Sequence, residues 1–147
     1  MEIAILGLGC FWGPEVKFSK LDGIIKTEVG YCGGHSSQTT YEEVCSGETN
    51  HAEVVKLDFD PKIISYEKIL KFFFEIHDPT TLNSQGPDFG TQYRSEIFYL
   101  NDQQKEISEK IIKEENIKFS GKIVTKTSLV KNYCPAEEYH QKYLQKR

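Results

Sequence analysis

Strand-like segments alternate with helical segments along the whole chain, and this order limits the fold more than any other feature of the sequence. Apolar runs or alternating patterns typical of strands occupy residues 3–8, 24–29, 51–59, 95–100 and 123–130. Helical patterns occupy residues 14–21, 66–77 and 101–116, with a short helix at 41–45 and a last helix begun by Pro135. This order predicts an α+β fold, an α/β sandwich in which helices pack on a mixed sheet, with a ferredoxin-like core as the most economical arrangement. We expect a single domain over residues 1–147, because no linker or repeat interrupts the pattern.

Composition and charge exclude several classes of protein. The net charge is −4 and no run is rich in Lys or Arg, which argues against a nucleic-acid partner. The apolar run at residues 3–8 is too short for a membrane span. Because it follows Glu2 and lacks a cationic lead, it also does not fit the lipid-attachment signal that Leu8-Gly9-Cys10 superficially suggests. We therefore expect a cytoplasmic protein that binds neither membranes nor nucleic acids.

The four cysteines are Cys10, Cys32, Cys45 and Cys134. They include no CxxC pair, and the four histidines lack a ligand spacing such as HExxH, so we expect no metal and no bound cofactor. Without a secretion signal, reduced thiols in a cytosol are a better interpretation than two disulfides.

Cys10 lies in the turn between the first predicted strand and the first predicted helix. A thiol at a helix N-terminus forms the nucleophilic thiolate more easily, because unpaired N–H groups favour negative charge. Phe11 and Trp12 follow directly and could hold an apolar methyl group. The alternative is that Cys10 is a small buried residue and both aromatic rings belong to the core. Gly9 and Gly13 favour the functional interpretation, because glycines allow close backbone approach and contribute nothing to packing.

Glu53 is a candidate general acid. It shares strand parity with the apolar residues Val55, Leu57 and Phe59, so its carboxyl should point towards the core, where burial raises the pKa of a carboxyl group. The alternative is a solvated Glu53 at a frayed strand start. His51 has the same parity, but a packed or surface histidine is the better interpretation.

Six motifs in the same order cover nearly the whole chain: GCFWGPE at Gly9, GYCGG at Gly30, TYEEVCSG at Thr40, HAEVV at His51, GTQYRS at Gly90 and AEEYHQKYL at Ala136. Together they resemble the A-type peptide methionine sulfoxide reductases. The resemblance implies an oxidoreductase with a redox-active cysteine that acts in protein repair under oxidative stress. Its substrate would be the S epimer of methionine sulfoxide, free or in peptides.

The resemblance also implies the roles of individual residues. Cys10 would attack the sulfoxide sulfur and become a sulfenic acid, while Glu53, with Tyr41 and Tyr93, would protonate or hydrogen-bond the oxygen. The tyrosine assignments rest on the resemblance alone.

Substrate binding would involve three further residues. Phe11 and Trp12 would hold the methyl group, and Asp88 would help to orient the substrate. Asp88 lies in the long connection at residues 78–93, a length that is often functional, although a solvated surface loop is the alternative. His140 is interpreted as a helix residue that packs near the site without a catalytic role.

The recycling of Cys10 is left open by the sequence. Many relatives carry resolving cysteines on a glycine-rich tail after the YHQxYL segment, and this sequence ends at Arg147 without one. An internal resolving thiol would then be Cys32, in a turn that could move, or Cys134, whereas Cys45 is predicted to be buried. Thioredoxin would reduce such a disulfide. The other route, which we favour here, is direct attack by an external thiol such as glutathione with glutaredoxin. Some relatives carry selenocysteine at the position of Cys10.

Three other functions compete with this interpretation. A thiol peroxidase would use the same sulfenic acid but would not need Trp12. A non-catalytic domain that binds methionine-containing peptides would keep its function in Cys10→Ser. A Cys-His hydrolase fits least, because no histidine stands out as an oriented base.

Overall fold

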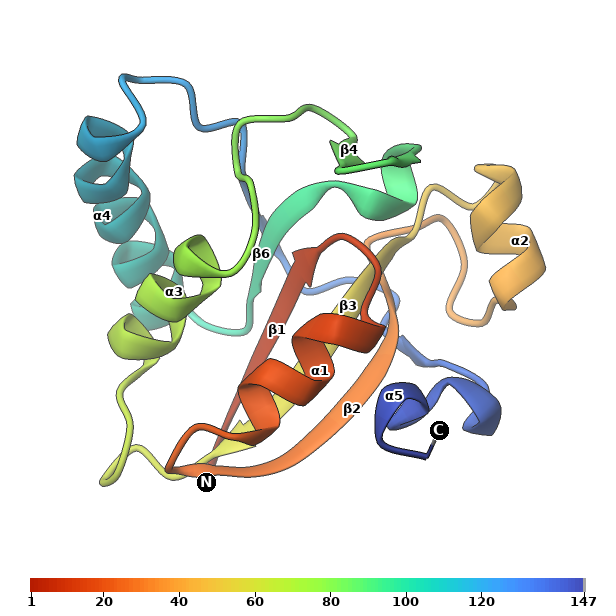
Figure 1. Cartoon of the computed structure of the whole chain (residues 1–147), viewed down its shortest axis with the longest axis horizontal. Helices are drawn as coiled ribbons and strands as arrows, with labels where there is room; N and C mark the ends of the chain where they lie inside the picture. Colours follow the sequence, from red (N-terminus) through yellow and green to blue (C-terminus); the bar gives the residue numbers. More distant parts are fainter. Residues whose placement is uncertain (147) are drawn as a thin grey trace.

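A six-stranded sheet forms the centre of the computed structural model, which describes residues 1–146 (Figure 1). Its strand order is β7-β6-β1-β3-β2-β8, and only the β6–β7 pair is parallel. The strands are β1 (Glu2–Leu8), β2 (Ile24–Cys32), β3 (Ala52–Phe59), β6 (Ser95–Tyr99), β7 (Lys126–Leu129) and β8 (Cys134–Pro135). A separate two-stranded hairpin joins β4 (Ser84–Gln85) to β5 (Asp88–Phe89).

The four central strands have the ferredoxin-like arrangement. In chain order the core elements are β1, α1 (Trp12–Ser19), β2, β3, α3 (Tyr66–Glu75) and β6, and the four strands lie side by side as β6-β1-β3-β2, all antiparallel. This confirms the predicted α+β class with its mixed sheet and packed helices. None of the helices in residues 1–146 combines the length and apolar character needed to cross a membrane.

The two faces of the sheet are covered differently. Helices α1 and α3 lie on one face, where the larger core includes Phe18 of α1, Leu57 of β3 and Phe73 of α3. Helix α4 (Asp102–Lys118) packs beside α3, and α2 (Tyr41–Ser46) lies beyond the opposite end of the sheet (Figure 1). The other face carries a smaller core of Ile5, Cys32, Ala52, Val54 and Phe98, on which Val130 and Tyr133 from the C-terminal part of the chain pack.

The C-terminal region differs from the sequence prediction. Pro135 does not begin a helix: it lies in edge strand β8, opposite Gly30, and is followed by a 3-10 turn η2 (Glu138–His140) and a short helix α5 (Tyr143–Lys146). Beyond the end of β8, the Gln141 side chain continues the hydrogen bonding along β2. It accepts a hydrogen bond from the Val29 N–H and donates one to the Val29 carbonyl. An edge position suits proline, because its missing N–H breaks no ladder hydrogen bond.

Candidate active site

The turn that carries Cys10 depends on one glycine. β1 ends at Leu8, and Gly9 has a φ of +97°, a conformation that side chains rarely adopt. A Cβ at Gly9 would also lie 2.7 Å from Cγ of Gln85 in β4. The prediction of a close approach is therefore confirmed for Gly9. It is wrong for Gly13, where a Cβ would meet nothing within 4 Å.

Cys10 lies just before α1, as predicted, but the helix N-terminus does not dominate its chemistry. Burial raises the pKa of the Cys10 thiol to about 11, and the charges of Glu53, Asp88 and Cys45 raise it further. A hydrogen bond from the Trp12 N–H opposes this increase. The expected stabilisation of the thiolate exists, but burial outweighs it, so Cys10 rests as the thiol.

Glu53 is buried on the α1 face of the sheet, as its strand parity predicts. Its side chain is 1% exposed, and Oε1 accepts a 3.4 Å hydrogen bond from the Phe11 N–H. Oε2 is buried and has no hydrogen-bond partner in the described part of the chain. Burial is the main cause that raises the pKa of Glu53 to about 8, and the charge of Asp88 adds to it. Glu53 is thus a carboxylic acid that keeps its proton at neutral pH.

Two tyrosines and Asp88 lie within electrostatic range of Glu53. Tyr93 ends the 3-10 turn η1 (Thr91–Tyr93), and its pKa is raised to about 12 by burial and by the charges of Glu53, Cys45, Asp88 and Cys10. Burial also raises the pKa of Tyr41, and the charge of Glu53 contributes. The structure therefore brings the hydroxyl donors predicted from the resemblance within electrostatic range of Glu53.

An aromatic cluster lies beside the Cys10 turn. The Trp12 Nε1–H donates a 3.2 Å hydrogen bond to Nδ1 of His140, and the Trp12 ring stacks on Tyr143 with centroids 3.9 Å apart. Phe11 is buried between Tyr31 (5.8 Å) and His140 (5.4 Å). Since Nδ1 is the acceptor, a neutral His140 carries its proton on Nε2, which is buried without a partner among residues 1–146. Sequence reasoning placed His140 near the site but could not find this hydrogen bond.

Glu137 is a site residue that the sequence analysis missed. One carboxylate oxygen accepts from the Tyr31 hydroxyl (2.8 Å) and the other from the N–H of Tyr41 (2.9 Å). The C-terminal segment thereby holds the first residue of α2 against the sheet. The only signal in the sequence was the position of Glu137 within the AEEYHQKYL motif.

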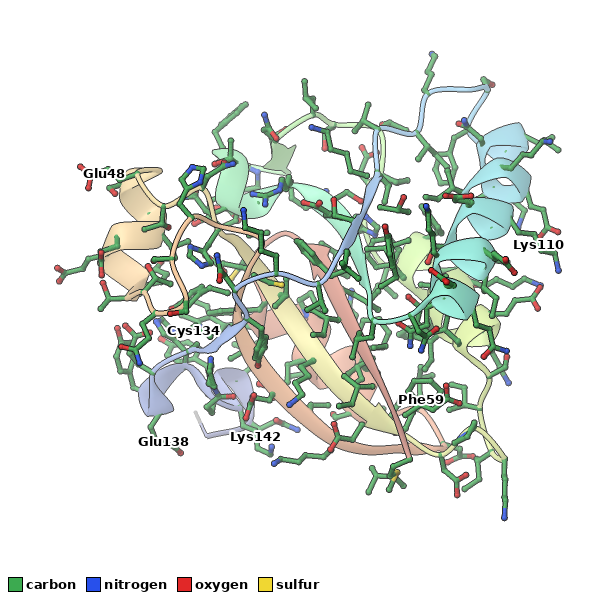
Figure 2. All side chains as sticks on the ribbon, turned by 180° about the vertical axis from the view of Figure 1, so that it is seen from behind. Glu48, Phe59, Lys110, Cys134, Glu138 and Lys142 are labelled. Carbon is green, nitrogen blue, oxygen red and sulfur yellow. The ribbon has the colours of Figure 1, made fainter. Side chains whose placement is uncertain are left out.

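The remaining cysteines differ from the sequence predictions. Cys32 is not in a movable turn: it is the last residue of β2, is 0% exposed and packs in the smaller core on the opposite face of the sheet. Cys45, predicted to be buried, is exposed, because Val44 is the residue of α2 that enters the core. Cys134 lies in β8, where its sulfur contacts the Thr39 carbonyl at 3.8 Å (Figure 2).

His51 is a packing residue. It is 0% exposed, its Nε2 lies 3.0 Å from the Ser36 carbonyl, and burial lowers its pKa. The His51 ring fills the space beside Gly34, since a Cβ added to Gly34 would lie 2.0 Å from Nδ1 of His51.

The site therefore combines a partly buried thiol, a carboxylic acid that holds its proton, two tyrosine hydroxyls and an aromatic cluster. Within residues 1–146, no three His, Cys, Asp or Glu side chains are grouped so that they could hold a metal ion. Such an arrangement can deliver a proton to a polar oxygen while a sulfur nucleophile attacks the adjacent atom.

Comparison with known proteins identifies close relatives. The family model described as "Peptide methionine sulfoxide reductase" matches residues 2–147. A peptide methionine sulfoxide reductase MsrA of Pelagibacter ubique is 81% identical over the full length of both chains. Mxr1 from Saccharomyces cerevisiae in its reduced form superposes with a TM-score of 0.96 at 44% identity, over 99% of this chain and 85% of Mxr1. Mxr1 in complex with Trx2 matches with a TM-score of 0.70 at 30% identity, over 97% of this chain and 84% of that chain.

Proposed function

Because the chain belongs to the peptide methionine sulfoxide reductase family, we propose that it reduces the S epimer of methionine sulfoxide, free or in peptides, to methionine. The observation that carries this proposal is the protonated Glu53 beside the Cys10 turn, with its Oε2 unpartnered in the described structure. A sulfoxide oxygen is a poor leaving group until it is protonated, and a buried carboxylic acid supplies that proton at neutral pH.

The reaction transfers one oxygen atom. The Cys10 sulfur attacks the sulfoxide sulfur, and Glu53 protonates the oxygen with Tyr41 and Tyr93 as hydrogen-bond donors. The oxygen ends on Cys10 as a sulfenic acid, and methionine leaves with its sulfur reduced by two electrons. Phe11 and Trp12 provide the apolar surface for the methyl group, and Asp88 orients the substrate.

A thiol reductant completes the cycle. The yeast Mxr1 complex with Trx2 supports a thioredoxin-type partner, and a glutathione and glutaredoxin system is the alternative. We place this activity in the cytoplasm, where the enzyme would repair oxidised proteins and where cellular thiols keep cysteines reduced.

An assay on separated sulfoxide epimers with dithiothreitol as reductant tests the proposal. We expect turnover of the S epimer only, no turnover by Cys10→Ser, and a severe loss in Glu53→Ala. Equal turnover of both epimers, or no turnover of the S epimer, would contradict the proposal. Faster consumption of hydroperoxide than of sulfoxide would favour a thiol peroxidase, and peptide binding without turnover would favour a binding domain.

A further inference from the structure

The three cysteines outside the turn occupy different surroundings. Cys32 lies on the opposite face of the sheet, Cys134 lies opposite Tyr31 on the active-site face, and Cys45 is the one whose charge acts on Cys10. Cys32 donates to the Lys131 carbonyl within the core of the opposite sheet face, so it cannot reach Cys10 without breaking β2. Cys134 lies on the edge strand β8, against the segment that precedes α2 (Figure 2). Cys45 lies in the last turn of α2 and is exposed.

Helix α2 presents Tyr41 and Cys45 on the same side, because residues four apart in a helix are neighbours. The Tyr41 ring lies 4.6 Å from the ring of His140, which in turn contacts Phe11 at 5.4 Å. A hydrogen bond also joins the Tyr41 hydroxyl to the Cys45 sulfur. The side of α2 that carries Cys45 is therefore the side that faces the Cys10 turn.

The electrostatic interactions agree with this placement. The charge of Cys45 raises the pKa of Cys10, and the charge of Glu53 raises the pKa of Cys45. The pKa of Cys32, by contrast, responds to Glu96 and Arg94. Because interactions between charges weaken with distance, Cys45 belongs to the cluster around Cys10 and Cys32 does not.

We propose that Cys45 is the resolving thiol, which attacks the sulfenic acid that Cys10 forms in the proposed reaction. The Cys45 sulfur bonds to the Cys10 sulfur, and the hydroxyl of the sulfenic acid leaves as water with the proton of the Cys45 thiol. An external thiol reductant then reduces this disulfide and restores both cysteines. This inference rests on the proposed function.

The surroundings of Cys45 suit this role. Burial raises the pKa of the Cys45 thiol, and the hydrogen bond from Tyr41 opposes this increase by stabilising the thiolate, which is the attacking form. Its exposure leaves the resulting disulfide accessible to a reductant protein. A disulfide needs the Cα atoms of Cys10 and Cys45 to lie about 4.4–6.8 Å apart. The six-residue helix α2 is joined to β2 and β3 by the irregular segments 33–40 and 47–51, where a shift of α2 towards the Cys10 turn would take place.

Single turnover without reductant tests the proposal. The protein is mixed with one equivalent of methionine S-sulfoxide, and released methionine, free thiols and linked peptides are measured, with dimedone present to trap sulfenic acid. We expect the unmodified chain to release one methionine, lose two thiols and give a peptide that links Cys10 to Cys45. Cys45→Ser should release one methionine, lose one thiol and carry dimedone on Cys10. Cys134→Ser is the matched control and should behave like the unmodified chain.

Two results would overturn the inference: a linked peptide that joins Cys10 to Cys32 or Cys134, or equal dimedone labelling of Cys10 in the unmodified chain and in Cys45→Ser. Methionine release by the unmodified chain separates this failure from failure of the proposed function. If no methionine is released at all, the function itself is wrong.

Discussion

Replacing Glu53 by Gln removes the proposed proton donor while keeping the shape of the side chain. The Gln carbonyl can still accept the hydrogen bond from the Phe11 N–H, which Glu53 Oε1 accepts at 3.4 Å. The carboxyl proton, however, is lost. Since Glu53 is 1% exposed, water does not easily replace it as a proton source. The substitution therefore tests proton transfer rather than packing.

The size of the effect follows from the pKa. With a pKa of about 8, roughly 90% of Glu53 is protonated at pH 7, whereas a carboxyl group of ordinary pKa would be less than about 1% protonated. Removing a positioned general acid costs about 10²- to 10⁴-fold in rate. We expect Glu53→Gln to release methionine in single turnover about 10²- to 10⁴-fold more slowly at pH 7.

The pH dependence of the rate ratio makes the test specific. Below the pKa of about 8 Glu53 keeps its proton, so the rate of the unmodified chain divided by the rate of Glu53→Gln should be constant. Above it the carboxylate forms and the ratio should fall about tenfold per pH unit. Glu53→Gln also removes the charge that raises the pKa of Cys10, so above the pKa of Glu53 Cys10 ionises less in the unmodified chain than in the variant, which adds to the fall in the ratio. A ratio below about threefold at pH 7, or one that does not change between pH 6 and pH 10, would refute the role of Glu53 as the acid.

Two further substitutions probe the turn and the aromatic cluster. Gly9→Ala should lower the free energy of unfolding by about 1–3 kcal/mol in a urea titration, because of the positive φ and the 2.7 Å approach to Gln85. Gly13→Ala is the control, because a Cβ at Gly13 would meet open space. An equal loss of unfolding free energy in both variants would contradict the explanation from positive φ and close approach. Trp12→Phe keeps an aromatic ring but loses the hydrogen bond to His140, so kcat/KM should fall by about 2- to 10-fold. An unchanged kcat/KM would show that this hydrogen bond does not position the substrate surface.

Local patterns were sufficient for the fold and for part of the site. The alternation in residues 51–59 predicted both strand β3 and the inward direction of Glu53, because strand periodicity alone decides the face. The helices predicted at residues 66–77 and 101–116 are also local: the side chains of Ser65 and Asn101 accept a backbone N–H as N-caps of α3 and α4.

Long-range contacts explain what the sequence could not predict. Pro135 looked like a helix start, yet the sheet edge beside Gly30 decides its conformation. Glu137 acquires its importance from Tyr31 and Tyr41, which lie about a hundred residues earlier in the chain. Cys45 is exposed because Val44 takes the buried side of α2, and no periodicity over six residues could decide between the two.

The same burial that keeps Glu53 protonated also keeps Cys10 a thiol, with pKa values of about 8 and about 11. A site of this kind disfavours ionising either group by itself, since a carboxylate at Glu53 raises the pKa of Cys10 further. For the proposed reaction the path of lowest free energy is therefore neutral overall. In it Glu53 would give its proton to the sulfoxide oxygen as the Cys10 sulfur attacks, and the proton released by Cys10 would return to Glu53. Burial, which appears unfavourable for a nucleophilic thiol, thus couples nucleophile formation to the presence of an oxygen that can accept a proton.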